Sequence, residues 1–132
     1  MTRVAVPVRY PLSDHSERTL RRAVDLALDR DADLLVLHID LYQSGRSVSR
    51  ADLRSAVERT VGRIDRARYV VRKGFLVEEA ILEEIAEESA NVVVIGGRQA
   101  GRWRRMLQRV FEGPDVDRYL RQHLDCEIIT VE

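Results

Sequence analysis

Five arginines follow a pair of glycines in the second half of this 132-residue chain. They are Arg98, Arg102, Arg104, Arg105 and Arg109, and Gly96 and Gly97 come directly before them. Guanidinium groups bind phosphates and carboxylates through paired hydrogen bonds, so a cluster of this kind predicts an anion site. The alternative is that the arginines face water or pair with the acidic residues between 112 and 117, and the sequence slightly favours this alternative.

The other reactive residue types form no combination that predicts catalysis or metal binding. His15, His38 and His123 are scattered along the chain, and Cys126 is the single cysteine. Ser13 lies near His15 in one short segment, but neighbours in a loop do not make a catalytic triad. We therefore expect no catalytic residues and no metal ligands, and we expect His38 to be a hydrogen-bonded core residue.

An apolar run at Val92–Ile95 directly precedes the two glycines. A continuous β-branched run is typical of a parallel strand that is covered on both faces. Glycines at its carboxyl end let the backbone turn sharply, at the edge where open α/β sheets bind ligands. We expect a buried strand followed by a turn at the glycines; a plain structural turn is the favoured interpretation, and a glycine loop of the phosphate-binding type is the alternative.

Apolar strand-like segments alternate with amphipathic helical segments along the rest of the chain. Strands are expected at about Arg3–Val8, Asp33–Ile39, Arg68–Arg72, Val92–Ile95 and Cys126–Val131. The third of these is the most polar, which predicts a less buried place in the sheet.

Five helical segments are expected between these strands. Capping boxes at Asp14 with Glu17 and at Ser49 with Asp52 predict the starts of the first two. The third follows Gly74 and is rich in glutamates, which we expect to face solvent. The remaining two are expected at Arg102–Phe111 and Asp115–His123.

The alternation predicts an α/β fold. We expect a single three-layer Rossmann-like domain over residues 1–132, with a five-stranded, mostly parallel sheet and helices on both faces. A length of 132 residues with 45% hydrophobic content suits one core of ordinary size.

The charge and composition exclude several classes of partner. The chain has 22 basic and 22 acidic residues, a net charge of +0, so no overall field attracts nucleic acid or an anionic membrane. No run approaches the roughly 20 apolar residues of a membrane helix, and no segment has the pattern of a signal peptide. One cysteine forms no disulfide framework. We expect a cytoplasmic protein with neither a membrane nor a nucleic-acid partner.

Four stretches in this order and spacing resemble a universal stress protein domain. They are Val4–Val8 with Ser13–Leu20, Ala32–Ile39, Gly74 with Glu79–Leu82, and Val93–Arg98. The resemblance implies a five-stranded Rossmann-like sheet that pairs into a homodimer through the last strand. The interface residues implied are Glu127, Ile128, Ile129, Thr130 and Val131.

Many members of that family bind ATP. They use an acidic residue after the first strand, backbone at the end of the second, and a loop of form G-x-x-G, nine residues, G-[ST]. The resemblance places the Ile39 backbone near a base and Gly96, Gly97, Arg98 and Gly101 near phosphates. The candidate nucleotide-binding residues are Arg9, Ile39, Gly96, Gly97, Arg98, Gly101, Arg102 and Gly113.

The sequence departs from that pattern at several positions. Arg9 occupies the place of the acidic residue, and Gln99 and Arg109 occupy the places of the later glycines. Gly101 and Gly113 are the displaced equivalents, but Pro114 then follows, which has neither a hydroxyl nor an N–H group. The motif that holds a triphosphate is therefore degraded.

The resemblance and its departures predict a non-catalytic, homodimeric regulatory or interaction module of the stress response, with no certain cofactor. A first alternative is a member that binds ATP, AMP or another anionic ligand through the arginine-rich segment. A second is a nucleotide-hydrolysing or nucleotidyl-transfer enzyme on the same fold, which would lack a carboxylate at the expected place.

Overall fold

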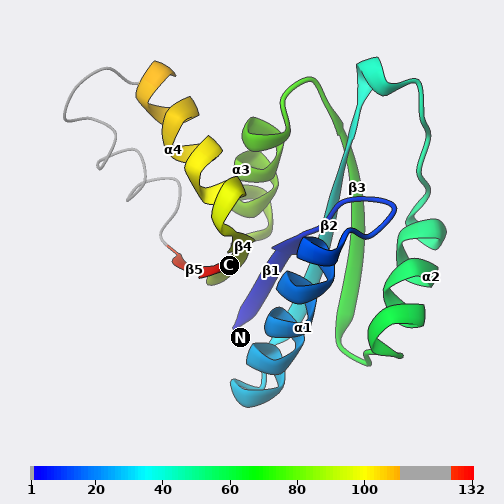
Figure 1. Ribbon diagram of the computed structural model, residues 1–132. Coiled ribbons are helices and arrows are strands. Elements are labelled where there is room, and N and C mark those ends of the chain that lie inside the picture. Colours follow the sequence, from blue (N-terminus) through cyan, green and yellow to red (C-terminus); the bar gives the residue numbers. More distant parts are fainter. Residues whose placement is uncertain (1, 111–125) are drawn as a thin grey trace.

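The computed structural model describes residues 2–110 and 126–132. Strands and helices alternate along the chain from one end to the other (Figure 1). The strands are β1 (Arg3–Pro7), β2 (Asp33–Leu41), β3 (Ala67–Gly74), β4 (Val92–Gly96) and β5 (Glu127–Val131). The helices are α1 (Asp14–Asp29), the 3-10 turn η1 (Tyr42–Ser44), α2 (Arg50–Val61), α3 (Val77–Glu88) and α4 (Gly97–Val110).

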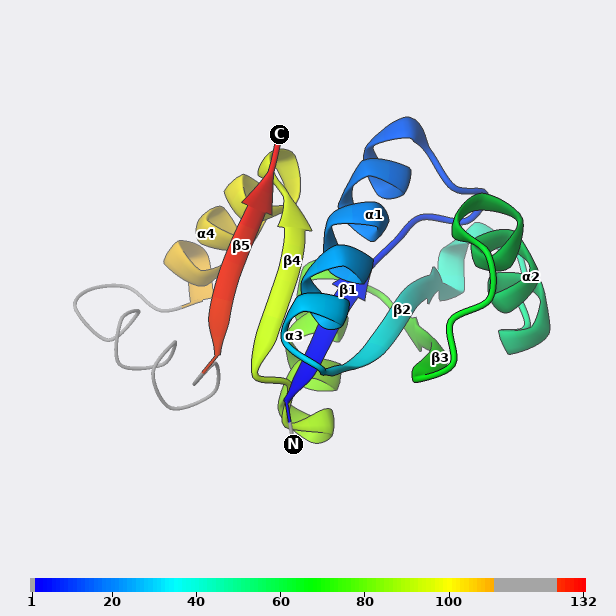
Figure 2. The ribbon, with the colours of Figure 1, turned by 90° about the horizontal axis from the view of Figure 1, so that it is seen from below.

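The five strands form one parallel sheet in the order β3-β2-β1-β4-β5, which Figure 2 shows edge to edge. β1 lies in the middle, where Val4 is in register with Leu34 on one side and Val92 on the other. The predicted α/β architecture is confirmed, including its five strands. The polar strand β3 lies at an edge, as its composition predicts.

The sheet has a separate core on each face because β2 is apolar at consecutive positions. Leu34 and Leu35 are both 1% exposed but belong to opposite faces, since successive side chains of a strand alternate. Leu34 packs in the core that contains Leu20 of α1 and Leu53 of α2. Leu35 packs in the other core with Ile81 of α3. Burying each such side chain contributes about 1.5–3 kcal/mol, so both layers are held firmly on the sheet.

The two expected capping boxes have different outcomes. At α2 the box is present as predicted, with Ser49 and Asp52 each accepting from the other's backbone N–H. At α1 the prediction is wrong by one residue, because Ser13 is the N-cap and its Oγ accepts from Ser16 N at 3.1 Å. Asp14 is already the first helical residue, where its charge favours the helix N-terminus.

The alternative of a glycine loop after β4 is wrong. β4 ends at Gly96 and α4 begins at Gly97, so the strand passes into the helix without a loop. Neither glycine has a positive φ; within the described residues the left-handed glycines are Gly45 and Gly62. The predicted helix at Arg102–Phe111 therefore begins five residues early. The helix predicted at Asp115–His123 lies outside the described residues, and so does Gly113.

The expectation of solvent-facing glutamates on α3 is wrong for Glu84, which is 6% exposed. Arg72 of β3 donates to Glu84 Oε2 at 2.7 Å and also pairs with Glu83 and Glu87. A buried carboxylate is stable only when it is paired, and the neighbouring edge strand supplies the partner.

Candidate functional site

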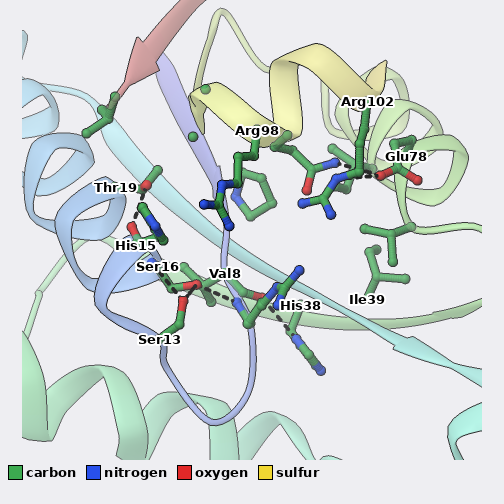
Figure 3. A pocket seen from close by; sticks show the side chains of 18 of the residues that line it. Val8, Ser13, His15, Ser16, Thr19, His38, Ile39, Glu78, Arg98 and Arg102 are labelled. Atoms are coloured by element: carbon green, nitrogen blue, oxygen red, sulfur yellow. Dashed lines mark hydrogen bonds and ion pairs between the residues drawn. The ribbon is translucent and has the colours of Figure 1, made fainter. Parts of the chain in front are cut away.

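A pocket of about 540 Å³ opens at the carboxyl ends of the strands. This is the edge where open α/β sheets bind ligands, and the volume is in the range of small-molecule sites. The first turns of α1, α3 and α4 form its walls (Figure 3). The lining residues are Pro7, Val8, Arg9, Ser13, His15, Ser16, Thr19, His38, Ile39, Val77, Glu78, Ile81, Gly96, Gly97, Arg98, Gln99, Arg102, Val131 and Glu132.

The wall on the α1 side is built from hydrogen-bonded hydroxyl groups. Ser16 is 7% exposed, and its Oγ accepts from Arg9 N at 2.9 Å and from Ser13 Oγ at 3.2 Å. Thr19 Oγ1 donates to the His15 carbonyl at 2.7 Å. These contacts fix the backbone at Arg9 against the start of α1, and they leave the exposed Arg9 side chain at the pocket.

His38 of β2 contacts the segment between β1 and α1 that carries Arg9. Its Nδ1 lies 2.9 Å from the Val8 carbonyl, which can only accept, so the proton is on Nδ1. The ring is 9% exposed and lies 6.2 Å from the ring of Tyr10, measured between centroids. The prediction that His38 is a hydrogen-bonded core residue is confirmed, although it also lines the pocket.

The opposite wall is a polar contact between the first turn of α3 and the first two turns of α4. Gln99 Nε2 donates to Glu78 Oε1 at 3.3 Å, and Arg102 Nε lies 3.4 Å from the same oxygen. The Arg102 Nε is buried, yet it makes no hydrogen bond within the described chain, so this contact is an ion pair without hydrogen-bond geometry. The Glu78 carboxylate is thus engaged by α4.

Arg98 extends from the first turn of α4 into the pocket, between the α1 wall and Glu78 (Figure 3). Within residues 2–110 and 126–132, neither the Arg98 guanidinium nor that of Arg9 has a hydrogen bond or an ion pair. The free N–H groups at the start of α4 add partial positive charge at the same place. The pocket therefore has unneutralised positive charge on one side.

The remaining part of the pocket is apolar. Ile39 at the end of β2 is 8% exposed and Ile81 of α3 is 1% exposed, and Val77 lies beside them in the lining. An apolar compartment beside a cationic one suits a ligand with a flat apolar part and an anionic group, as a nucleotide has.

The pocket collects six of the eight candidate nucleotide-binding residues. Those lining it are Arg9, Ile39, Gly96, Gly97, Arg98 and Arg102. Gly101 lies in the second turn of α4 and does not line it, and Gly113 lies outside the described residues. The side chains of Trp103, Arg104 and Arg109 are likewise outside the description, so the arginine cluster is described only at Arg98, Arg102 and Arg105.

Sequence reasoning missed the polar residues of the first helical turns, such as Ser16, Glu78 and Gln99. Each follows the carboxyl end of a parallel strand by a few residues. Because those strand ends meet at one edge of the sheet, the first turn of every following helix faces the same space. A polar residue in the first helical turn after a parallel strand was therefore the signal in the sequence that could have identified these pocket residues.

β5, the strand implied to form a dimer interface, has β4 on one side and lies at the sheet edge in the described chain. Ile128 is 42% exposed, and Glu127 and Thr130 are also exposed, while Ile129 and Val131 are half-buried against the core. Arg30 donates to Glu127 Oε2 at 2.7 Å, so Glu127 already has an ion pair within the chain. That pair lowers the pKa of Glu127.

No helix among the described residues is long and apolar enough to cross a membrane. In the same part of the chain, no group of three or more histidine, cysteine, aspartate or glutamate side chains is arranged to hold a metal ion. Cys126, expected to be buried, is half-buried beside the core under α3 and α4.

The parallel sheet, with helices on both faces, defines a Rossmann-like α/β protein. The universal stress protein family model matches residues 1–132, and the chain belongs to that family. None of the curated proteins matches the sequence.

Solved structures of the same fold include proteins with bound adenine nucleotides. A universal stress protein in complex with cAMP is 18% identical, with a TM-score of 0.57 over 97% of this chain and 96% of that one. A universal stress protein from Archaeoglobus fulgidus in complex with dAMP is also 18% identical, with a TM-score of 0.58 over 100% and 98%. The protein UspA from Lactobacillus plantarum is 15% identical, with a TM-score of 0.60 over 99% and 97%.

Proposed function

We propose that this universal stress protein is a non-catalytic regulatory module that binds an adenine mononucleotide, of the AMP type, in the pocket at the carboxyl edge of the sheet. The observation that carries the proposal is Arg98, whose guanidinium enters the pocket without an acidic partner in the described chain. A phosphate between Arg98 and the α4 N-terminus would supply that partner, and the apolar compartment at Ile39 would receive the base.

Two structural neighbours support a mononucleotide ligand, because they were solved with cAMP and with dAMP. The departures from the triphosphate motif point the same way. Gly101 lies in α4 and does not line the pocket, so among the described residues no further glycine extends the phosphate site beyond Gly96 and Gly97.

The non-catalytic part of the proposal is supported by the state of the reactive side chains. Activation of a nucleophile requires a hydrogen bond from a hydroxyl to a base. Here Ser13 and Ser16 bond to each other, and Thr19 bonds to backbone. His38 Nδ1 is bonded to the Val8 carbonyl, and Glu78 is engaged by Gln99 and Arg102.

The test begins with the nucleotide content of the purified protein, released by denaturation and identified by chromatography. Calorimetric titration with AMP and ATP then gives the affinities, and a product assay with ATP gives any turnover. We expect AMP to bind without turnover. If no adenine nucleotide binds, the proposed ligand is wrong. If ATP is hydrolysed at the pocket, the proposed non-catalytic role is wrong.

The module is proposed to act as a homodimer through β5. β5 has no strand on its outer side among the described residues and carries the exposed Ile128, so its edge offers backbone groups and apolar surface to a second copy. Sedimentation should give a dimer mass for the native chain and a monomer mass for Ile128→Lys; Thr60→Lys on α2 is the control. A monomeric native chain would end this part of the proposal. The proposed setting is the cytoplasm, which the single cysteine supports.

A further inference from the structure

The charged side chains that line the pocket do not cancel. Three are arginines, Arg9, Arg98 and Arg102, and two are glutamates, Glu78 and Glu132. Arg102 and Glu78 form an ion pair with each other at 3.4 Å. That leaves two arginines without a partner in the described chain and one carboxylate, Glu132, at the end of β5.

Glu78, one of the two carboxylates in the lining, is already engaged by α4, which leaves only Glu132 to offer free oxygens to a cation. Mg²⁺ in nucleotide sites is held by phosphate oxygens and by one or two carboxylates with free oxygens. The Oε1 atom of Glu78 is taken by both Gln99 and Arg102. No acidic cluster for a metal occurs among the described residues.

We infer that the pocket takes its nucleotide as a metal-free phosphomonoester dianion, with Arg98 and Arg9 supplying the positive charge that a divalent cation would otherwise supply. This inference rests on the proposed function and specifies the charge and metal state in which the nucleotide binds. A guanidinium offers two parallel N–H donors to a phosphate, and such charge-assisted bonds are about twice as strong as neutral ones. Arg98 and Arg9 can each pair with one of the two negative charges of a phosphomonoester at neutral pH, which leaves Glu132, at the end of β5, as the one unpaired carboxylate of the lining.

The inference predicts an order of affinity among three related ligands. AMP has a dianionic phosphate, whereas the phosphodiester of cAMP has a single charge. Losing one guanidinium–phosphate charge pair should weaken binding about tenfold, or 1.4 kcal/mol. ATP complexed with Mg²⁺ would bring a cation next to unpaired arginines, where like charges repel. The expected order is therefore AMP, then cAMP, with magnesium ATP the weakest.

The experiment is calorimetric titration of the full chain with AMP, cAMP and ATP, each in EDTA and in magnesium chloride. AMP affinity should change less than twofold between the two buffers, and added magnesium should weaken ATP binding. Arg98→Gln should reduce AMP affinity tenfold or more. Arg9→Gln should reduce the AMP affinity and bring the ratio between AMP and cAMP close to one.

Arg54→Gln is the matched control for the lost charge. Arg54 is exposed on α2, pairs with Glu58 at 2.8 Å and does not line the pocket, so its variant should bind AMP as the native chain does. Circular dichroism of all three variants establishes that they are folded before their affinities are compared.

The outcomes separate the inference from the function on which it rests. AMP binding that requires magnesium, tightest binding by magnesium ATP, or AMP binding that is unaffected by both arginine substitutions would overturn the metal-free site while the nucleotide pocket stands. Failure of AMP, cAMP and ATP to bind in either buffer would overturn both.

Discussion

Arg102 Nε lies 3.4 Å from Glu78 Oε1 and so connects the second turn of α4 to the first turn of α3 in one wall of the pocket. The contact lacks hydrogen-bond geometry, although the nitrogen is buried. Glu78 therefore neutralises an arginine that the pocket would otherwise offer to an anion.

The first prediction is that Glu78→Gln tightens the binding of AMP. The glutamine keeps the size of the side chain and an oxygen for Gln99, but it releases the Arg102 charge. Partly exposed ion pairs contribute roughly 0.2–1 kcal/mol, so affinity should rise by up to about fivefold in titration calorimetry. Glu79→Gln, in the same helical turn but exposed and outside the pocket lining, is the control. Weaker AMP binding by Glu78→Gln would mean that the Glu78 carboxylate itself contacts the ligand.

The second prediction separates two glycines of α4. A Cβ at Gly97 would meet only Thr130 Cγ2 at 3.8 Å and Glu132 atoms at 3.9 Å, which are ordinary contacts, so alanine fits the fold. It would nevertheless add a methyl group to the pocket lining, where the ligand comes close to the backbone. Gly97→Ala should weaken AMP binding about tenfold without loss of thermal stability.

Gly101→Ala is the counterpart in the same helix. A Cβ there would meet only the end of the flexible Arg105 side chain, at 3.9 Å, and the residue does not line the pocket. Alanine in place of glycine within a helix should stabilise the fold by about 0.5–1 kcal/mol and leave AMP affinity unchanged. If Gly101→Ala weakens binding as strongly as Gly97→Ala does, the ligand lies elsewhere than proposed.

The sequence predicts the fold well because its buried strands are nearly continuous apolar runs. The run from Leu34 to Ile39 is apolar at nearly every position, and only a strand covered on both faces by helices gives such a run. The site is predicted less well. The family glycine pattern directs attention to Gly101, but the chain continues α4 through that residue.

The missed residues show why spacing alone was insufficient. Glu78 looks like one of many glutamates on a solvated helix, and its pairing with Arg102 depends on the distance between two neighbouring helices. Ser16 looks like an ordinary residue in the first turn of a helix, although it accepts the hydrogen bond from Arg9 N. Such contacts depend on how the elements pack together, which local sequence patterns do not predict.

The third prediction concerns Asp40, at the end of β2. The carboxylate is 3% exposed, and its Oδ2 accepts from Lys73 Nζ at 2.8 Å and from Val48 N at 3.1 Å, which fastens the segment before α2 to β3. The Lys73 hydrogen bond is the main reason why the pKa of Asp40 is below its ordinary value of 3.8. Asp40→Asn should therefore lower the free energy of unfolding at pH 7 by about 1.5–3 kcal/mol.

The pH dependence gives the sign of this effect. Because folding lowers the pKa of Asp40, its stabilisation is complete above about pH 3.8 and is lost as the pH falls through the lower folded value. The difference in melting temperature between the native chain and Asp40→Asn should therefore stay constant from pH 7 to about pH 4 and shrink as the pH falls further to 3. Asp25→Asn, exposed on α1, is the control. A difference that stays constant down to pH 3 would contradict the role of the charge.

The fourth prediction has the opposite sign from most core substitutions. Tyr69 of β3 is 7% exposed in the core under α1 and α2, and its hydroxyl has no hydrogen-bond partner within the described residues. Burial raises the pKa of this phenol for the same reason that it makes the unpaired hydroxyl costly. Tyr69→Phe keeps the ring and removes the unsatisfied group, so it should raise the free energy of unfolding by up to about 1 kcal/mol in a denaturant titration. Tyr42→Phe, at an exposed position, should change it by less than about 0.5 kcal/mol. If Tyr69→Phe instead destabilises the protein by 1 kcal/mol or more, the hydroxyl has a partner in the folded state.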